Sequence, residues 1–161
     1  MNRVALVTGA SRGIGRAIAA ELAEAGHAVC INYLTHRQEA ETLAEKIRNH
    51  GGNAIAVQAD VADRAAVETM VRTAEAELGP VSLLVNNAGI DTQPSAPPEV
   101  SGPFENFPEE IFREVVDVNL VGTFLACQAV GARMVKAGKG GSIINVGSIY
   151  GMLSPIQDIY A

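Results

Sequence analysis

Short aliphatic runs alternate with longer helical patterns along the chain, and this alternation restricts the possible folds more than any other feature. The runs predicted as strands are residues 4–8, 28–33, 54–59, 81–85 and 142–146. The patterns predicted as helices are residues 15–25, 36–49, 63–78, 108–116 and 120–137. Alternation of this kind joins parallel strands through right-handed helical crossovers. The sequence therefore predicts an α/β fold with a doubly wound parallel sheet in one domain, residues 1–161, and we expect the strand order 3-2-1-4-5.

The composition supports this fold and argues against several classes of partner. Hydrophobic residues make up 48% of the chain and aromatic residues only 4%, so we expect an aliphatic core typical of parallel sheets covered on both faces. The formal net charge of −6 argues against nucleic acid or a membrane as the main partner. His27, His36 and His50 lack the spacing of metal ligands, so no metal site is predicted. Cys30 and Cys127 are interpreted as buried thiols of a cytoplasmic protein.

A glycine-rich turn follows the first predicted strand, with the sequence TGASRGIG at residues 8–15. The glycine spacing is weak evidence by itself, but here it follows a strand and opens a helix. In that context Gly9 permits a sharp turn, Gly13 allows backbone N–H groups to approach a pyrophosphate, and Gly15 lets helix and strand pack closely. The turn therefore predicts a dinucleotide-phosphate site, the alternative being an ordinary glycine-rich connection between strand and helix.

Polar or glycine-containing segments follow each of the other predicted strands as well. They are Asn32-Tyr33, Asp60-Val61, Asn86-Asn87-Ala88-Gly89 and Gly147-Ser148. Because the carboxyl ends of parallel strands lie on one edge of a sheet, folding should bring these segments and the glycine turn to one rim. Ligands of such sheets bind at this edge, so the rim is the predicted binding site. The segment at residues 91–107, rich in Pro, Ser and acidic residues, is interpreted as a loop over it.

Taken in order, these motifs resemble the short-chain dehydrogenase/reductase family, and the first half of the chain is similar to its 3-oxoacyl-acyl-carrier-protein reductases. The resemblance implies a Rossmann dinucleotide-binding domain, incomplete at its carboxyl end, in an oxidoreductase that moves hydride between a nicotinamide cofactor and a carbonyl or secondary alcohol. It implies cofactor contacts from Gly9, Ser11, Arg12, Gly13, Ile14 and Gly15 at the pyrophosphate, Asn32, Tyr33, Asp60 and Val61 at the adenosine, and Asn87, Ala88 and Gly89 at the nicotinamide side. The alternatives are a helix cap for Asp60 and a polar strand end for Asn86 and Asn87.

The residues after the second strand bear on the choice of cofactor. A carboxylate there would accept hydrogen bonds from the 2′-hydroxyl of NAD and repel the 2′-phosphate of NADP. Residues 32–38 contain no carboxylate, the first being Glu39. Arg12 in the glycine turn can supply a cation to a phosphate, unless it is only a solvated surface charge. The sequence therefore favours NADP(H) over NAD(H).

Catalysis in the family uses a Tyr phenol that exchanges a proton with the substrate oxygen, beside a Lys that stabilises the phenolate. A Ser holds the carbonyl oxygen and an Asn supports the proton relay. By resemblance, Ser148 matches the Ser, with a turn or cap serine as the alternative. Asn119 matches the Asn, and an additional role as N-cap of the following helix is compatible with it.

The catalytic Tyr is the point where this sequence departs from the family pattern. That pattern is Y-x-x-x-K with the Tyr usually thirteen positions after the Ser, whereas Tyr160 lies twelve positions after Ser148 and the sequence ends at Ala161. The stretch from Ser148 to Tyr160 also resembles a branch of the family with an insert before the working Tyr. We therefore expect the catalytic Tyr and Lys beyond Ala161, with Tyr160 as the alternative within the chain.

The predicted helix at residues 120–137 is apolar over most of its circumference. Burial against the sheet uses only one face of a helix, so the other is expected to meet a second subunit, which the resemblance also implies. The full-length protein is then expected to be a homodimer or homotetramer acting on a small carbonyl or alcohol substrate. A sugar or polyol dehydrogenase of the same family, and a dinucleotide-binding module without turnover, are the rival interpretations.

Overall fold

Five parallel strands form one sheet in the order β3-β2-β1-β4-β5, which confirms the predicted fold class and strand order. The computed structural model describes residues 3–91 and 104–151. The strands are β1 (Val4–Val7), β2 (Ala28–Tyr33), β3 (Ala54–Gln58), β4 (Val81–Asn86) and β5 (Ser142–Asn145). Their registers align the carboxyl ends, for example Val7 beside Ile31 and Val85. The segments that follow the strands therefore share one edge of the sheet.

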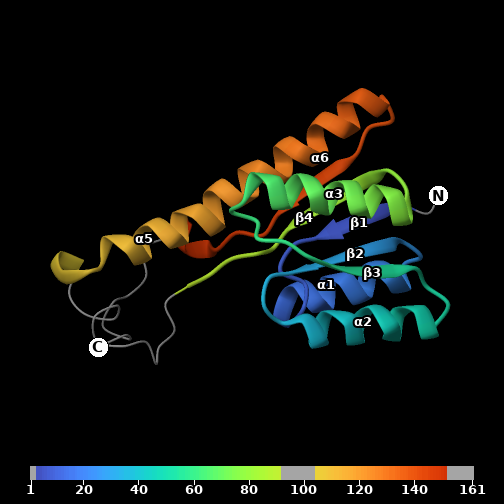
Figure 1. The fold of residues 1–161 in the computed structure, drawn as a ribbon, viewed down its shortest axis with the longest axis horizontal. Helices are drawn as coiled ribbons and strands as arrows, with labels where there is room; N and C mark the ends of the chain where they lie inside the picture. The colour runs from blue at the N-terminus through green and yellow to red at the C-terminus, as the bar shows by residue number, and fades with distance from the viewer. Residues whose placement is uncertain (1–2, 92–103, 152–161) are drawn as a thin grey trace.

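Helices cover both faces of the sheet (Figure 1). Helices α1 (Gly13–Glu24) and α2 (Arg37–Asn49) lie on one face, and α3 (Arg64–Leu78) and α6 (Thr123–Ala137) lie on the other. Side chains alternate between two cores because successive strand residues point to opposite faces. In β1, Leu6 joins the core beneath α3 and α6, whereas Val7 joins the core beneath α1 and α2. The central strands are therefore buried on both sides, as their aliphatic composition predicts.

The helix ends are shifted by a few residues from the predicted bounds, and two of them show characteristic caps. Asp63, predicted as a helical residue, lies outside α3 as its N-cap, and its carboxylate accepts hydrogen bonds from Ala65 N at 2.7 Å and Ala66 N at 3.2 Å. Gly138 ends α6 with φ 63° and ψ 13°, the left-handed conformation that favours glycine. Helix α1 begins at Gly13 rather than at the predicted Gly15, so the glycine turn supplies its first residues.

One long helix replaces the two separate helices predicted over residues 108–137. Helix α5 (Glu109–Val116) continues through a π segment (Asp117–Gly122) directly into α6. The backbone stays helical across both junctions, with φ −63° and ψ −43° at Val116 and φ −59° and ψ −44° at Gly122. The predicted N-cap role of Asn119 is therefore wrong, because this residue lies inside a continuous helix. A π segment accommodates one extra residue per turn without ending the helix.

The continuous helix Glu109–Ala137 is also long and apolar enough to cross a membrane, by length and composition alone. Part of this apolar character has another explanation in the fold. Leu125, Ala126, Ala129 and Val130 are buried against the sheet and α3. A core helix passes the same test of length and composition, so the test does not assign this helix to a membrane.

Candidate functional site

The glycine turn packs tightly against the segment that follows β4. Gly9 has φ 61°, and a Cβ atom there would lie 2.8 Å from the Ala88 Cα. A Cβ at Gly15 would lie 2.6 Å from Gly9 O and would also overlap the side-chain amide of Asn87. Gly13 has a similar positive φ of 56°, but a Cβ atom there would meet nothing within 4 Å, so no neighbouring atom crowds this glycine. Gly9 and Gly15 thus serve internal packing, whereas Gly13 presents exposed backbone at the rim.

Thr8 and Asn87 hold these two segments together. The Thr8 hydroxyl accepts hydrogen bonds from Asn87 N and Ala88 N, both at 3.0 Å. In return, Asn87 Nδ2 donates to Thr8 O at 3.0 Å and to Gly9 O at 3.1 Å. Thr8 is buried, so these bonds are shielded from water. This linking role of Thr8 was not predicted from the sequence, where the position of Thr8 at a strand end is the only signal for it.

Asn32 fixes the position of the turn from the side of β2. Its Oδ1 accepts a hydrogen bond from Gly9 N at 3.1 Å, and its Nδ2 donates to Ala59 O at 3.0 Å. Its main-chain carbonyl accepts a further bond from Ala10 N at 2.8 Å. Asn32 and Tyr33 are 1% and 5% exposed. The structure therefore places both side chains behind the rim, and Asn32 acts on the turn through Gly9 instead of offering its amide to a ligand.

Asp60 and Val61 lie at the same edge, after β3. The Asp60 carboxylate accepts a hydrogen bond from Ala62 N at 2.9 Å, which shapes the local turn. The helix cap considered for Asp60 is instead Asp63. Val61 is buried against the long helix, where a Cβ on Gly122 would lie 2.8 Å from its Cγ2. This close approach brings the π segment up to the rim.

Arg12 projects from the turn toward the connection between β2 and α2. Its Nη1 lies 3.3 Å from His36 Nε2, and His36 Nδ1 lies 2.9 Å from the Thr35 hydroxyl. Within the described residues Arg12 forms no ion pair, in contrast to Arg37, which lies 2.7 Å from Glu41. Among the described residues of the rim, Arg12 is therefore a cation without a carboxylate partner. The contact between Arg12 and His36 was not predicted from the sequence.

Asn119 is anchored to the segment after β4 through both ends of its amide. Its Oδ1 accepts a hydrogen bond from Ile90 N and its Nδ2 donates to Ile90 O, each at 2.9 Å. The Thr123 hydroxyl donates to Asn119 O at 2.9 Å. Each end of the Asn119 amide thus makes one hydrogen bond to Ile90, which positions the chain beside Gly89. Segments with π geometry are frequent at functional sites.

Ser148 follows β5 at the same edge of the sheet. Its carbonyl accepts a hydrogen bond from Gly151 N at 3.0 Å in a short 3-10 turn, Ile149–Gly151. Strand β5 is held beside β4 by the buried Asn86, whose Nδ2 donates to Asn145 Oδ1 at 2.8 Å. Tyr160 lies outside the described residues, as does most of the loop predicted over the site.

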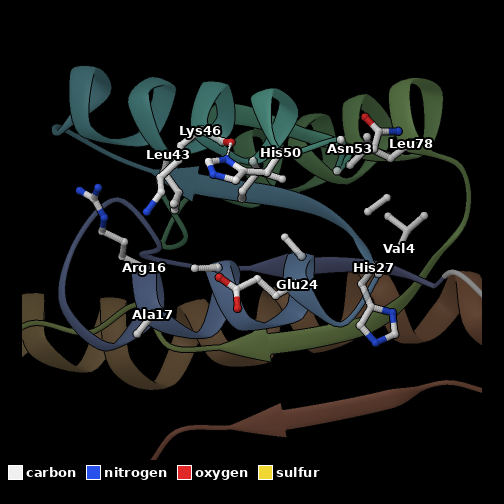
Figure 2. A pocket seen from close by; sticks show the side chains of 17 residues that line it. Val4, Arg16, Ala17, Glu24, His27, Leu43, Lys46, His50, Asn53 and Leu78 are labelled. Atoms are coloured by element: carbon white, nitrogen blue, oxygen red, sulfur yellow. Dashed lines mark hydrogen bonds between the residues drawn. The ribbon is translucent and has the colours of Figure 1, made fainter.

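A cavity in the described part of the structure lies away from the rim. This cavity, of about 960 Å³, lies between α1 and α2 and reaches the amino ends of the strands at Val4 and Ala28 (Figure 2). None of the predicted site residues lines it.

Burial raises the pKa of the Cys30 thiol to about 12, so this cysteine is not a nucleophile. No group of three or more His, Cys, Asp or Glu side chains in the described ranges is arranged to hold a metal ion.

The family model for short chain dehydrogenases matches residues 3–161. The chain therefore belongs to the short-chain dehydrogenase family of oxidoreductases. Its parallel sheet, with the strand order 3-2-1-4-5, is the Rossmann fold of this family.

Curated relatives and solved structures agree with this assignment. The chain is 41% identical over 160 residues to an uncharacterized oxidoreductase of Methylorubrum extorquens, covering 99% of this chain and 60% of that protein. It is 40% identical over 153 residues to a 3-oxoacyl-acyl-carrier-protein reductase of Staphylococcus epidermidis, covering 95% and 59%. A mutant short-chain dehydrogenase/reductase of Serratia marcescens superposes with a TM-score of 0.85 at 35% identity, covering 99% and 61%. The chain thus spans about three fifths of the length of these similar proteins.

Proposed function

We propose that this chain binds NADP(H) at the rim and forms the cofactor-binding part of a cytoplasmic reductase that transfers hydride between the nicotinamide and a carbonyl or secondary alcohol. The observation that carries the proposal is the pair of segments joined by Thr8 and Asn87. Hydrogen bonds between these two residues fix the glycine turn against the segment after β4. The backbone at Gly13, on the other side of the turn, stays exposed and has no neighbour within 4 Å of a Cβ position.

The residues at the rim have the chemistry that a dinucleotide needs. A pyrophosphate would lie over the exposed backbone at Gly13 and the amino end of α1, where N–H groups and the helix dipole favour negative charge. Ile14 is 67% exposed and offers apolar surface beside it. The remaining proposed contacts are Gly9, Ser11, Arg12 and Gly15 in the turn, Asp60 and Val61 at the adenine, and Asn87, Ala88 and Gly89 toward the nicotinamide.

The preference for the phosphorylated cofactor rests on charge. Arg12 is a cation without a carboxylate partner in the described structure, and it reaches the connection after β2 where a 2′-phosphate would lie. The first acidic residue on that connection is Glu39, on the first turn of α2. We infer that the site attracts a 2′-phosphate and lacks the carboxylate that would select a 2′-hydroxyl.

The proposed catalytic groups follow from position at the same edge. Ser148 would donate a hydrogen bond to the substrate carbonyl oxygen, next to the segment that ends at Gly89. Asn119 would act as a positioning residue, because its amide is committed to Ile90. The bound cofactor would supply or accept the hydride. A Tyr phenol with a neighbouring Lys would exchange the proton, and we place both beyond Ala161, with Tyr160 as the alternative.

The substrate class is proposed from similarity to a known protein, and the assembly from exposed apolar side chains. One of the similar proteins is named a 3-oxoacyl-acyl-carrier-protein reductase, which suggests a 3-oxoacyl thioester. Helix α6 and the π segment expose Leu120, Phe124 and Val135 at 67%, 55% and 83%, and this face would meet a second subunit.

The proposed function is tested by binding and by turnover. NADPH should bind the chain with higher affinity than NADH, measured by isothermal titration calorimetry. A Thr8→Val variant, which keeps the shape of Thr8 but removes its hydroxyl, should weaken the binding of both cofactors, because Asn87 N and Ala88 N lose the acceptor that joins their segment to the glycine turn. In the full-length protein, NADPH should reduce a 3-oxoacyl thioester. Absence of dinucleotide binding in a folded chain would contradict the proposal.

A further inference from the structure

The cavity between α1 and α2 has the size and the regular walls of a small-molecule site (Figure 2). Its volume of about 960 Å³ lies in the range of such sites. Ala17, Ala20 and Glu24 follow one another on α1 at intervals of three and four residues, and Leu43 and Ile47 are four apart on α2. Residues at these intervals share one face of a helix, so each helix turns a single face to the cavity.

The walls of this cavity are aliphatic. On the α1 side, Ala17, Ala20 and Ala23 each present only a methyl group, which leaves space between the two helices. Leu43 and Ile47 form the opposite wall, and both are buried. Among the described residues that line the cavity, none is Phe, Tyr or Trp. The walls therefore suit an aliphatic chain better than a planar ring that would stack on an aromatic side chain.

Two cations, Arg16 on α1 and Lys46 on α2, line the same cavity from opposite helices. In Figure 2 their charged ends lie at the same end of the cavity. Neither forms an ion pair within the described residues. The sequence explains this, because no acidic residue lies three or four positions from Arg16 or Lys46 on its own helix. One end of the cavity thus holds two cations without a carboxylate partner.

The opposite charge lies further along α1. Among the described residues that line the cavity, Glu24 carries the only carboxylate side chain. It follows Arg16 by eight residues, which at the rise of an α-helix is roughly 12 Å along the axis. In a chain with a formal net charge of −6, the pair of cations is a local reversal of sign. The cavity therefore favours an anionic group at Arg16 and Lys46, joined to a chain that ends before Glu24.

We propose that this cavity binds a medium-chain aliphatic carboxylate such as octanoate. The carboxylate accepts hydrogen bonds from Arg16 and Lys46, and the alkyl chain lies along Ala17 and Ala20, opposite Ile47. Charge-assisted hydrogen bonds orient the anionic group, and removal of the alkyl chain from water adds affinity. The site is separate from the rim, because none of the residues proposed to bind the dinucleotide lines it. The inference therefore does not rest on the proposed function.

Three ligands test the two parts of this recognition. Binding of octanoate to the chain is measured by calorimetry, with octanol and butyrate for comparison. Octanol keeps the alkyl chain without the charge, and butyrate keeps the carboxylate with a much shorter chain. Each should bind at least about tenfold more weakly than octanoate, because each loses one of the two contributions. Equal affinity of octanol would contradict the role of the cations, and equal affinity of butyrate would contradict the role of the aliphatic walls.

Charge variants connect the binding to this cavity. Arg16→Gln and Lys46→Gln should each weaken octanoate by about three- to tenfold and leave octanol unchanged. Lys136→Gln is the matched control, because Lys136 is also an exposed lysine in the last turn of its helix, but α6 covers the other face of the sheet. It should bind octanoate like the wild type. A similar loss in all three variants would show a general effect of charge and overturn the proposal.

A substitution that fills the cavity gives an independent test. Ala20→Leu places a larger side chain on the α1 wall with a residue that favours helices, so octanoate binding should be lost while circular dichroism remains that of the wild type. A folded Ala20→Leu variant that binds octanoate normally would contradict the proposal. If this variant does not fold, the comparison of Lys46→Gln with Lys136→Gln decides, since both change exposed side chains.

Competition with NADPH separates the cavity from the rim. Octanoate should bind with the same affinity in the presence and absence of saturating NADPH, and its largest NMR shifts should fall at residues 16–24 and 43–50. Displacement of octanoate by NADPH, shifts concentrated at residues 8–15 and 87–90, or no binding of octanoate to the folded chain would overturn the inference. Each of these results leaves the proposed function to be judged by its own binding test.

Discussion

Substitution of Gly15 by alanine should destabilise the protein, although alanine is the better helix former. Gly15 lies in the first turn of α1, where a methyl group would overlap the Asn87 amide and lie 2.6 Å from Gly9 O. Both neighbours belong to the glycine turn and its partner segment, so neither can move without breaking the hydrogen bonds that join them. The predicted effect therefore measures how tightly these two segments pack.

The expected magnitude combines three terms. Overpacking of a well-packed site costs about 1–3 kcal/mol. Displacement of Asn87 weakens two hydrogen bonds, of 3.0 and 3.1 Å, at about 1 kcal/mol each or less. The gain in helix propensity offsets at most about 1 kcal/mol. At the middle of these ranges the net loss is about 2–3 kcal/mol, which for a chain of this size lowers the melting temperature by roughly 4–12 °C.

Urea unfolding followed by circular dichroism measures this loss, and Gly131→Ala is the matched control. Gly131 lies inside α6, and a Cβ there would meet only Ile143 Cδ1 at 3.9 Å. That substitution should stabilise the protein by up to about 1 kcal/mol, because it improves helix propensity without a clash. The reasoning is refuted if Gly15→Ala is as stable as the wild type, or if both variants change stability in the same direction.

Arg12→Ala should weaken NADPH by about 1–3 kcal/mol and leave NADH nearly unchanged; equal losses in calorimetry would contradict the assigned phosphate contact. Cys30 should resist thiol reagents at pH 8 in the folded protein, because burial raises its pKa to about 12, and Cys127 should react first; peptide mapping of labelled sites that finds Cys30 modified would disprove this. In the full-length protein, Ser148→Ala should lower kcat by about two orders of magnitude or more, since the carbonyl loses its orienting donor. Tyr160→Phe should mainly alter KM, and a collapse of kcat would instead place the catalytic phenol at Tyr160.

The sequence predicted the sheet well because each strand is punctuated by local chemistry. The bounds of β2 agree with prediction at both ends, and Gly26, with a φ of 86°, lies between the end of α1 and this strand. Punctuation of this kind is encoded locally, so a single sequence is enough to recognise it. The parallel arrangement followed from the crossover rule, whereas the order 3-2-1-4-5 is one of the orders that doubly wound sheets adopt and does not follow from handedness alone.

The long helix and the inner face of the site could not be predicted in the same way. The π segment depends on contacts between distant residues, with Asn119 bonded to Ile90 and Gly122 packed on Val61. The role of Asn32 likewise depends on where Gly9 lies after folding. The strand pattern puts these polar residues at the correct edge of the sheet, but it does not distinguish a side chain that faces a ligand from one that holds the backbone in place.

The central claim is that the dinucleotide lies on the rim formed by the glycine turn and the segment after β4. It is tested most directly by ¹H–¹⁵N NMR spectra of the chain during titration with NADPH. The account predicts that the largest shifts occur at residues 8–15, 60–62 and 87–90, with little change around the cavity between α1 and α2. Shifts concentrated at Glu24, Lys46 and His50, which line that cavity, or no shifts in a folded sample, would contradict it.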